Sequence, residues 1–190
     1  MKRSVAIAAF AMVGMSGCST PADDVGAGGA IQATLSVTSA DFADGTPMPD
    51  WTTANALGGQ CAGDNTNPQL SWESPSTGTA GFALTMIDTD ARDFVHWMLA
   101  DIPASTTSIE RGAADEAGAV GGKGTLSSEY DGTYFGPCPP GPDHHYVFTV
   151  YALDAALALE PGFTFGELKA AMKGHILAQG SVTGLRSGPA

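Results

Sequence analysis

The chain has 190 residues, and its 20 acidic residues outnumber its 8 lysines and arginines, which gives a formal net charge of −12 at pH 7. This length suits one domain with a hydrophobic core of its own. The negative charge argues against nucleic acid as a partner, because so few basic residues cannot follow a phosphate backbone.

The first seventeen residues have the composition of a secretory signal peptide. Lys2 and Arg3 precede an apolar run over residues 5–13, which is too short to cross a bilayer as a helix. Cys18 then follows a Ser-Gly pair, as the lipidated cysteine does in bacterial lipoproteins. Lipidation of Cys18 is therefore predicted, with an ordinary signal peptide cleaved nearby as the alternative.

Residues 18–30 are rich in glycine, alanine, proline and aspartate, and they predict a flexible tether. A signal peptide (1–17), this tether and a single domain (31–190) then make up the chain. Removing seventeen residues from 190 leaves 173, and the loss of Lys2 and Arg3 takes the formal charge from −12 to −14. We expect an exported protein, anchored by lipid to the cell envelope. The residue after the cysteine is Ser19 rather than aspartate, which favours the periplasmic face of the outer membrane.

Two cysteines remain after Cys18 is assigned to lipid, namely Cys61 and Cys138. An even pair in an exported protein favours a disulfide between them. The alternative is two buried thiols, because a free cysteine packs like a small apolar residue.

Strands are predicted where apolar residues alternate or where aromatic and β-branched residues gather. The predicted strands cover residues 31–37, 69–73, 82–88, 94–101, 144–153 and 181–185. Ile102-Pro103 is expected to end the fourth of them. Residues 111–129 are rich in glycine, alanine and serine, and predict a long excursion over the surface.

One helix is predicted near the end of the chain. Thr164 and Glu167 have the spacing of a capping box, and apolar residues then recur at helical intervals as far as Ile176. Gly180 is expected to terminate this helix. The fold class is therefore mostly β and antiparallel, with a late helix packed on the sheets.

Three polar residues stand near strand ends on faces that are otherwise apolar. Alternation places Asp88 on a face with Leu84 and Met86, and His144 on a face with Tyr146. His96 is expected to share a face with Phe94 and Met98, with Trp97 opposite it. A charged group on such a face needs a partner, so Asp88, His96 and His144 are predicted to meet one another or a ligand. His145 and Trp97 are assigned structural roles.

Six stretches, in order and at matching spacing, resemble the phosphatidylethanolamine-binding protein family in its bacterial branch of Raf-kinase-inhibitor-like proteins. They cover most of residues 41–186 and read DGTPMPDW, NTNPQLSW, GFALTMIDTDA, FVHWMLADIPASTTSIERGA, YFGPCPPGPDHHYVFTVYALD and LKAAMKGHILAQGSVTG.

The resemblance implies a β-sandwich of two antiparallel sheets with a small C-terminal helical flank, and an anion pocket at one end. It places six residues in that pocket: Asp88, Asp90, His96, Gly136, His144 and Tyr146. A histidine can carry positive charge near neutral pH, and loop amides can add donors. The expected ligand is a small anion such as phosphate or a phospholipid head group, with no metal and no cofactor.

The chain departs from the family pattern in two places. The family's Asp-Pro-Asp-Ala-Pro reads Asp-Thr-Asp-Ala-Arg over residues 88–92, so both prolines are absent and the geometry of this loop is in question. The family's His-Arg-Tyr reads His-His-Tyr over 144–146, which removes a cation that Arg92 is a candidate to replace.

The favoured function is that of a binding protein without catalytic residues. The predicted residues suit a small anion, and no nucleophile is evident among them. Modulation of a partner protein through the same surface is compatible with it. The alternative is a metal-dependent or acid–base enzyme that uses Asp88, His96 and His144. A third interpretation is a lipoprotein that binds another protein through residues 111–129.

Overall fold

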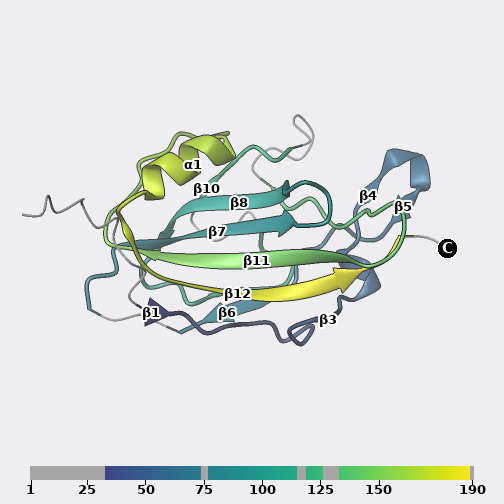
Figure 1. Cartoon of the computed structure of the whole chain (residues 1–190), viewed down its shortest axis with the longest axis horizontal. Helices are drawn as coiled ribbons and strands as arrows, with labels where there is room; N and C mark the ends of the chain where they lie inside the picture. Colours follow the sequence, from purple (N-terminus) through teal and green to yellow (C-terminus); the bar gives the residue numbers. More distant parts are fainter. Residues whose placement is uncertain (1–32, 74–76, 115–118, 126–132, 189–190) are drawn as a thin grey trace, which may run out of the picture.

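The computed structural model describes residues 33–73, 77–114, 119–125 and 133–188, without the side chain of Leu57. A large sheet and a smaller one stack face to face, and one helix covers part of the opposite face of the large sheet (Figure 1). The mostly β sandwich with a helical flank is thereby confirmed. The predicted signal peptide, Cys18 and the tether lie outside the described residues.

The described residues form twelve strands, one α-helix and two short 3-10 turns. The helix α1 spans Phe165–Met172, and the turns η1 and η2 span Asp50–Thr52 and Leu57–Gly59. The strands are β1 (Ala33–Thr34), β2 (Val37–Thr38), β3 (Thr46–Pro47), β4 (Asn55–Ala56), β5 (Cys61–Ala62), β6 (Leu70–Trp72), β7 (Gly81–Asp88), β8 (Phe94–Pro103), β9 (Ser108–Ile109), β10 (Val120–Gly121), β11 (His144–Leu153) and β12 (Ile176–Arg186).

The large sheet has the strand order β1-β12-β11-β7-β8-β10, and β3 also pairs with β12. Its long strands β7, β8, β11 and β12 are antiparallel, but β1 and β3 both run parallel to β12. The large sheet is therefore mixed, which corrects the prediction of purely antiparallel sheets. The smaller sheet, β2-β6-β9, is antiparallel, and β4 and β5 form a separate hairpin.

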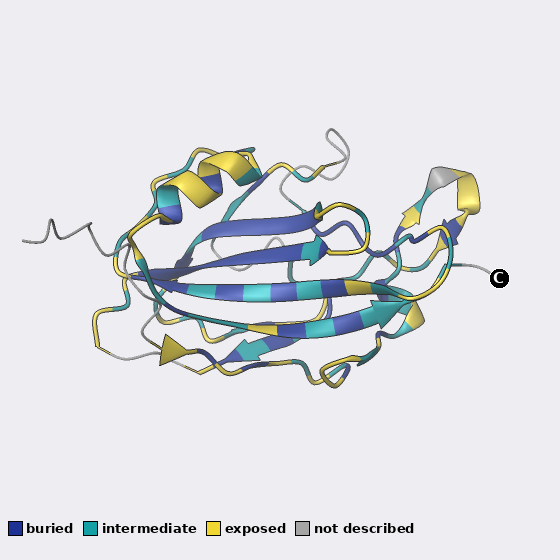
Figure 2. Cartoon of the chain, in the orientation of Figure 1, coloured by how far each residue is buried: buried dark blue, intermediate teal, exposed yellow. Residues whose placement is uncertain are grey.

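Burial follows the position of each strand in the sandwich (Figure 2). Strands β7 and β8 are buried along almost their whole length because the small sheet covers one face and α1 the other. Strand β11 alternates between buried and half-buried positions, as predicted, with Tyr146, Phe148 and Val150 turned into the core. Apolar residues on both faces of a central strand anchor the sheet that carries the site.

The helix is much shorter than predicted. Its capping box is confirmed, since the Thr164 hydroxyl accepts from the Glu167 amide and the Glu167 carboxylate accepts from the Thr164 amide. The helix ends at Met172, and the chain then turns at Gly174, which adopts a positive φ of 86°. Residues from Ile176 onward belong to β12, so the apolar pattern there continues into a strand.

Three further predictions need correction. The strand predicted over residues 31–37 is split into β1 and β2, and Ala33 is exposed. The strand at residue 94 continues through Ile102 to Pro103, which is tolerated because Pro103 is its last residue. Residues 115–118 and 126–129 of the predicted surface excursion lie outside the described residues. The described part of it contributes β10 to the sheet edge, and Ala114 and Ala119 pack against the core.

Gly180 is in the middle of β12 and does not end a helix. A Cβ atom at this position would collide with the backbone carbonyl of Leu35, which runs alongside β12. We expect Gly180→Ala to lower the free energy of unfolding by about 2 kcal/mol or more, because backbone must move to accept the methyl group. Chemical denaturation monitored by tryptophan fluorescence measures this loss.

Gly166→Ala is the matched control, because a Cβ atom there would approach only the Thr164 hydroxyl, at 3.8 Å, and the position is helical. It should leave stability unchanged or raise it slightly. Equal losses for the two variants would contradict the packing role assigned to Gly180.

Candidate functional site

The residues predicted to meet are brought together at one end of the large sheet. Here β7 ends, β11 begins, and the loop of residues 134–140 passes across the strand ends. A pocket of about 180 Å³ opens between them. Its lining consists of Asp88, Ala91, Phe94, His96, Phe135, Cys138, Pro139, Pro140, His144 and Tyr146. The walls are mostly aromatic and proline rings, and the polar groups are few, as is usual for a small-molecule site.

Asp88 is the fixed acceptor of the pocket. Its Oδ1 accepts hydrogen bonds from the backbone amides of Asp90 and Ala91 at 3.0 and 3.1 Å. Its Oδ2 lies 2.7 Å from Nδ1 of His144. The carboxyl side chain is 4% exposed, so these contacts replace the water that burial removes.

His144 is held in one orientation by Asp88. Because a carboxylate accepts, Nδ1 of His144 is the donor, and Nε2 remains the ring nitrogen for a ligand. Protonation of Nε2 would give the ring a second donor and a positive charge balanced by Asp88. In metal sites and active sites, a carboxylate that accepts from the other ring nitrogen orients the imidazole in the same way.

His96 reaches the pocket because β8 contains an extra residue opposite β7. The register passes from Met86↔Trp97 directly to Ile87↔Val95, so His96 occupies a β-bulge. The predicted alternation fails there. Trp97 and Tyr146 both belong to the core between the two sheets, and the Tyr146 ring also contacts His96. Met98 packs on the other face, under the helix.

His96 is neutral at physiological pH. It is buried, stacks on Phe135 with ring centroids 5.4 Å apart, and its Nδ1 lies 2.9 Å from the Phe135 carbonyl oxygen. A carbonyl only accepts, so Nδ1 carries the proton and Nε2 a lone pair. Burial lowers the pKa of His96 from 6.5 to about 4, against smaller opposing effects of the Phe135 carbonyl and Asp88. The positive charge expected of a pocket histidine is therefore not supplied by His96.

Tyr146 supplies a hydroxyl at the base of the pocket. The residue is fully buried and lies directly opposite Asp88 in the β7–β11 register. Burial, followed by the proximity of the Asp88 carboxylate, raises the pKa of Tyr146 well above its usual range, so the hydroxyl keeps its proton. Its oxygen has no hydrogen-bond partner of good geometry among the described residues, although Asp88 and the Cys138 amide are close to it.

The loop of residues 134–140 is pinned on both sides. The Gly136 amide donates to Oδ1 of Asn65 at 2.8 Å, and the Asn65 side-chain amide donates to the Tyr134 carbonyl at 3.0 Å. A disulfide joins Cys61 to Cys138, with Cα atoms 5.7 Å apart. Gly136 cannot gain a side chain, because a Cβ atom would strike the backbone at Thr52 and Ala54.

This arrangement limits the donors that the loop can offer. Pro137, Pro139 and Pro140 have no N–H, and the Gly136 amide is already bonded to Asn65. Only the Cys138 amide is left near the pocket. Gly136 is not among the lining residues, and its part is to let the loop approach residues 52–54, which lead into β4.

Asp90 also does not line the pocket. Its Oδ2 accepts from the backbone amide of His145 at 2.8 Å and lies 2.9 Å from Nδ1 of the same residue. The hydrogen bond from that amide is the largest of the effects that lower the pKa of Asp90. Asp90 and His145 thus fasten the 88–93 turn to β11 from the outer side, in line with the structural role predicted for His145.

The loss of the two family prolines changes this turn. Arg92 and Asp93 both adopt a positive φ of 56°. Proline is restricted to a φ near −65°, so position 92 could not hold one in this conformation. Arg92 is exposed and is not part of the lining, so it does not replace the missing cation of the pocket.

Outside the loop of residues 136–140, three lining residues were missed in the sequence. Phe94 is two residues before His96 in β8, on the same face. This alternation could have placed Phe94 in the predicted pocket. Phe135 and Ala91 come from loops, whose path has no sequence periodicity. Trp97, assigned a structural role, is confirmed as a core residue with 1% exposure.

The metal alternative has no geometric support in the part of the chain that the structure describes. No group of three or more histidine, cysteine or acidic side chains there is arranged to hold an ion. Asp88 and His144 are bonded to each other, and Nδ1 of His96 faces a carbonyl.

Comparison with known proteins agrees with this geometry. The family model for phosphatidylethanolamine-binding proteins matches residues 38–187, which include every lining residue of the pocket. The chain belongs to the phosphatidylethanolamine-binding protein family.

Named relatives and solved structures come from several organisms. The UPF0098 protein of Methanothermobacter thermautotrophicus is 37% identical over 134 residues, which are 66% of this chain and 85% of that protein. LppC of Mycobacterium tuberculosis, named as a candidate lipoprotein, is 40% identical over 134 residues, covering 68% of this chain but only 61% of LppC. The crystal structure of YbcL from E. coli, titled a member of the mammalian PEBP family, has a TM-score of 0.73 at 26% identity, covering 82% of this chain and 99% of YbcL.

The depressed pKa of His96 predicts an acid-sensitive fold. The unfolded chain binds a proton at this histidine below its ordinary pKa near 6.5, whereas the folded protein binds it only near 4. Stability is therefore complete above pH 6.5 and falls between pH 6.5 and 4, by about 3 kcal/mol from this residue alone. Urea denaturation at a series of pH values measures the loss.

His96→Gln keeps a donor for the Phe135 carbonyl but does not titrate, so its stability should depend less on pH by about the same ~3 kcal/mol. His145→Gln, altered at an exposed position next to the pocket, should keep the wild-type dependence. Identical pH profiles for wild type and His96→Gln would refute the neutral, buried state of His96.

Proposed function

We propose that this chain is an exported, lipid-anchored member of its family that binds a small anion, phosphate or a phospholipid head group, in the Asp88–His144–Tyr146 pocket. The observation that carries the proposal is the pair of buried Asp88 with half-buried His144, beside a protonated tyrosine hydroxyl without a good partner. Binding an acceptor there would satisfy that hydroxyl, and an unpartnered buried donor costs about 1–3 kcal/mol.

The chemistry of the pocket favours an anion that also carries an O–H or N–H group. Tyr146 and the Cys138 amide can donate to phosphate oxygens, and Nε2 of His144 can do so when its ring is protonated. His96 offers a lone pair at Nε2, which accepts a hydrogen bond from a phosphate O–H or from an ammonium group. Phe94 and Phe135 pack on two sides of His96, with ring centroids 4.7 and 5.4 Å away, and exclude water from these contacts.

Binding rather than catalysis is proposed because Asp88, His144 and His96 already make hydrogen bonds within the protein. The cysteine and the tyrosine of the lining are not available as nucleophiles, since Cys138 is in a disulfide and the Tyr146 hydroxyl keeps its proton. The same set of contacts suits a receptor whose shape is fixed before the ligand arrives.

O-phosphoethanolamine and inorganic phosphate, titrated into the protein and followed by calorimetry and by NMR of the histidine rings, test the pocket. We expect His144→Gln and Tyr146→Phe each to weaken binding by about 10- to 100-fold, because each removes one donor to a charged ligand.

His145→Gln is the matched control, since this neighbour of His144 is 53% exposed and points away from the pocket. It should bind like the wild type. If wild type binds neither compound, or if the His144 and His145 variants bind equally, the anion pocket is refuted.

The proposed anchor has a separate basis. The sequence around Cys18 resembles a lipoprotein signal, and a 40% identical relative is named as a candidate lipoprotein. No helix in the described part of the chain is both long and apolar enough to cross a bilayer. On the basis of the signal sequence and the relative's name, the proposal assigns attachment to the membrane to lipid on Cys18.

We expect the full chain, expressed in a bacterium that processes lipoproteins, to fractionate with membranes and to take up labelled palmitate. Cys18→Ser should move it to the soluble fraction and abolish labelling, while Ser19→Ala should change neither. A Cys18→Ser variant that still fractionates with membranes would contradict the lipid anchor.

A further inference from the structure

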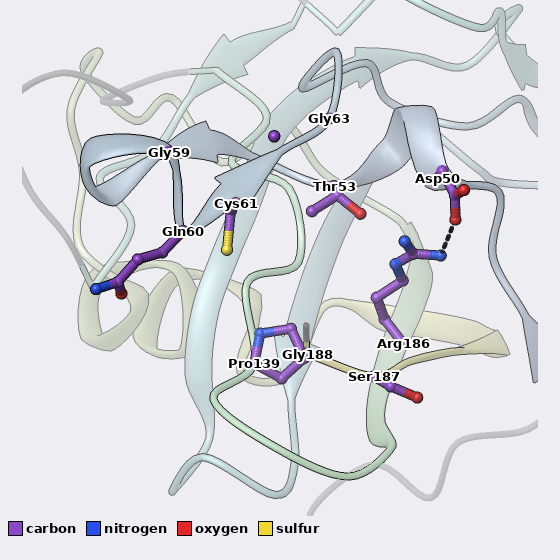
Figure 3. A pocket seen from close by; sticks show the side chains of 11 residues that line it. Asp50, Thr53, Gly59, Gln60, Cys61, Gly63, Pro139, Arg186, Ser187 and Gly188 are labelled. Atoms are coloured by element: carbon purple, nitrogen blue, oxygen red, sulfur yellow. Dashed lines mark ion pairs between the residues drawn. The ribbon is translucent and has the colours of Figure 1, made fainter. Parts of the chain in front are cut away.

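A second and larger pocket lies on the other side of Pro139 (Figure 3). Its volume is about 360 Å³, and it opens between η1, the β4–β5 hairpin and the end of β12. The residues that matter for its chemistry are Asp50, Thr53, Arg186 and Ser187. Arg186 is the one cationic side chain among its lining residues.

The two pockets share a wall. Pro139 lines both of them, and the disulfide joins Cys61 of the second pocket to Cys138 of the first. His144 and Arg186 are directly paired in the β11–β12 register, so their side chains stand next to each other on one face of the sheet. His144 of the first pocket and Arg186 of the second pocket are thus neighbours across two adjacent strands.

Arg186 has unused donors. Its side chain is 21% exposed, and Nη1 lies 2.7 Å from the Asp50 carboxylate and donates to the Met48 carbonyl at 3.1 Å. Nε is buried and has no partner among the described residues. Desolvated guanidinium donors that stay unpaired are costly, and a planar carboxylate or phosphate satisfies several of them at once.

Thr53 provides a second unsatisfied group in the same pocket. Its hydroxyl oxygen is buried and unpartnered within the described residues. Figure 3 shows the Thr53 hydroxyl turned toward the tip of the Arg186 side chain. Two unpartnered polar atoms in the wall of one cavity indicate that a polar ligand is missing there.

Two acidic side chains lie at the edge of this pocket. Asp50 pairs with Arg186, but its side chain is 95% exposed, so water screens the ion pair and a ligand can displace it at little cost. Asp143 accepts a hydrogen bond from the Ser187 hydroxyl and is thereby directed toward that residue.

We propose that the Arg186 pocket is a second acid-binding subsite, so that the ligand of this protein carries two acidic groups. One acid would sit at His144 and Tyr146, and the other, a carboxylate or phosphate, at Arg186 and Thr53. The ligand would cross the rim at Pro139. This inference rests on the anion pocket proposed above and adds the second acid to the ligand class.

Matched compounds that differ in one charge test it. The probes are ω-phosphonocarboxylates with chains of two, four and six carbons, each compared with its carboxylate methyl ester by calorimetry. In wild type we expect at least one acid to bind about tenfold more tightly than its own ester, as a hydrogen-bonded charge pair provides. In Arg186→Gln this ratio should fall to about one.

Asp50→Asn supplies a second variant that leaves Arg186 and its strand intact. It removes the competing carboxylate, so the ratio of acid to ester affinity should rise several-fold. Equal binding of every acid and its ester in wild type, or a ratio that survives Arg186→Gln, would overturn the second subsite while leaving the first. Absence of binding by acids, esters and phosphate alike would overturn both proposals.

Discussion

The register of β11 with its two neighbours fixes the polar end of the sheet. Pairing with β7 is unbroken over eight residue pairs and sets Tyr146 opposite Asp88. Pairing with β12 sets His144 opposite Arg186. A shift of one residue in either register would turn these side chains to the other face, into the apolar core or into solvent. Both the proposed anion pocket and the proposed second subsite therefore depend on how one strand is paired.

Desolvation decides how the site treats charge. Buried in an aromatic setting, His96 stays neutral and offers a lone pair, and Tyr146 keeps its proton. Asp88 can remain buried only because two amides and His144 donate to it. The pocket is thus a preformed array of one carboxylate, two imidazoles and one hydroxyl, held by the disulfide-pinned loop. Under the proposed function, such an array would bind a small polar ligand with little rearrangement.

The chain keeps the family fold while altering the rim of its pocket. The turn after Asp88 uses residues with positive φ where the family has a proline, and Asp90 is drawn outward to His145. The cation missing from the His-Arg-Tyr pattern is not recovered by Arg92. Arg186, at the end of β12, is the cation that the fold brings next to His144. Ligand preference in this member is therefore expected to differ at the rim more than at the base of the pocket.

Local patterns of alternation and capping predicted most of β7, β8 and β11, the capping box and the meeting of Asp88, His96 and His144, and the resemblance to the family added Tyr146. The same local patterns overextended the helix to Gly180, because an apolar period does not reveal where Gly174 turns the chain into β12. Tertiary structure decided the bulge that brings His96 to the pocket, the neutral state of that ring, and the outward position of Asp90. It also placed Arg186 beside His144, from a segment 42 residues further along the chain. These features arise from strand pairing and from burial, and neither is a property of a residue's neighbours in sequence.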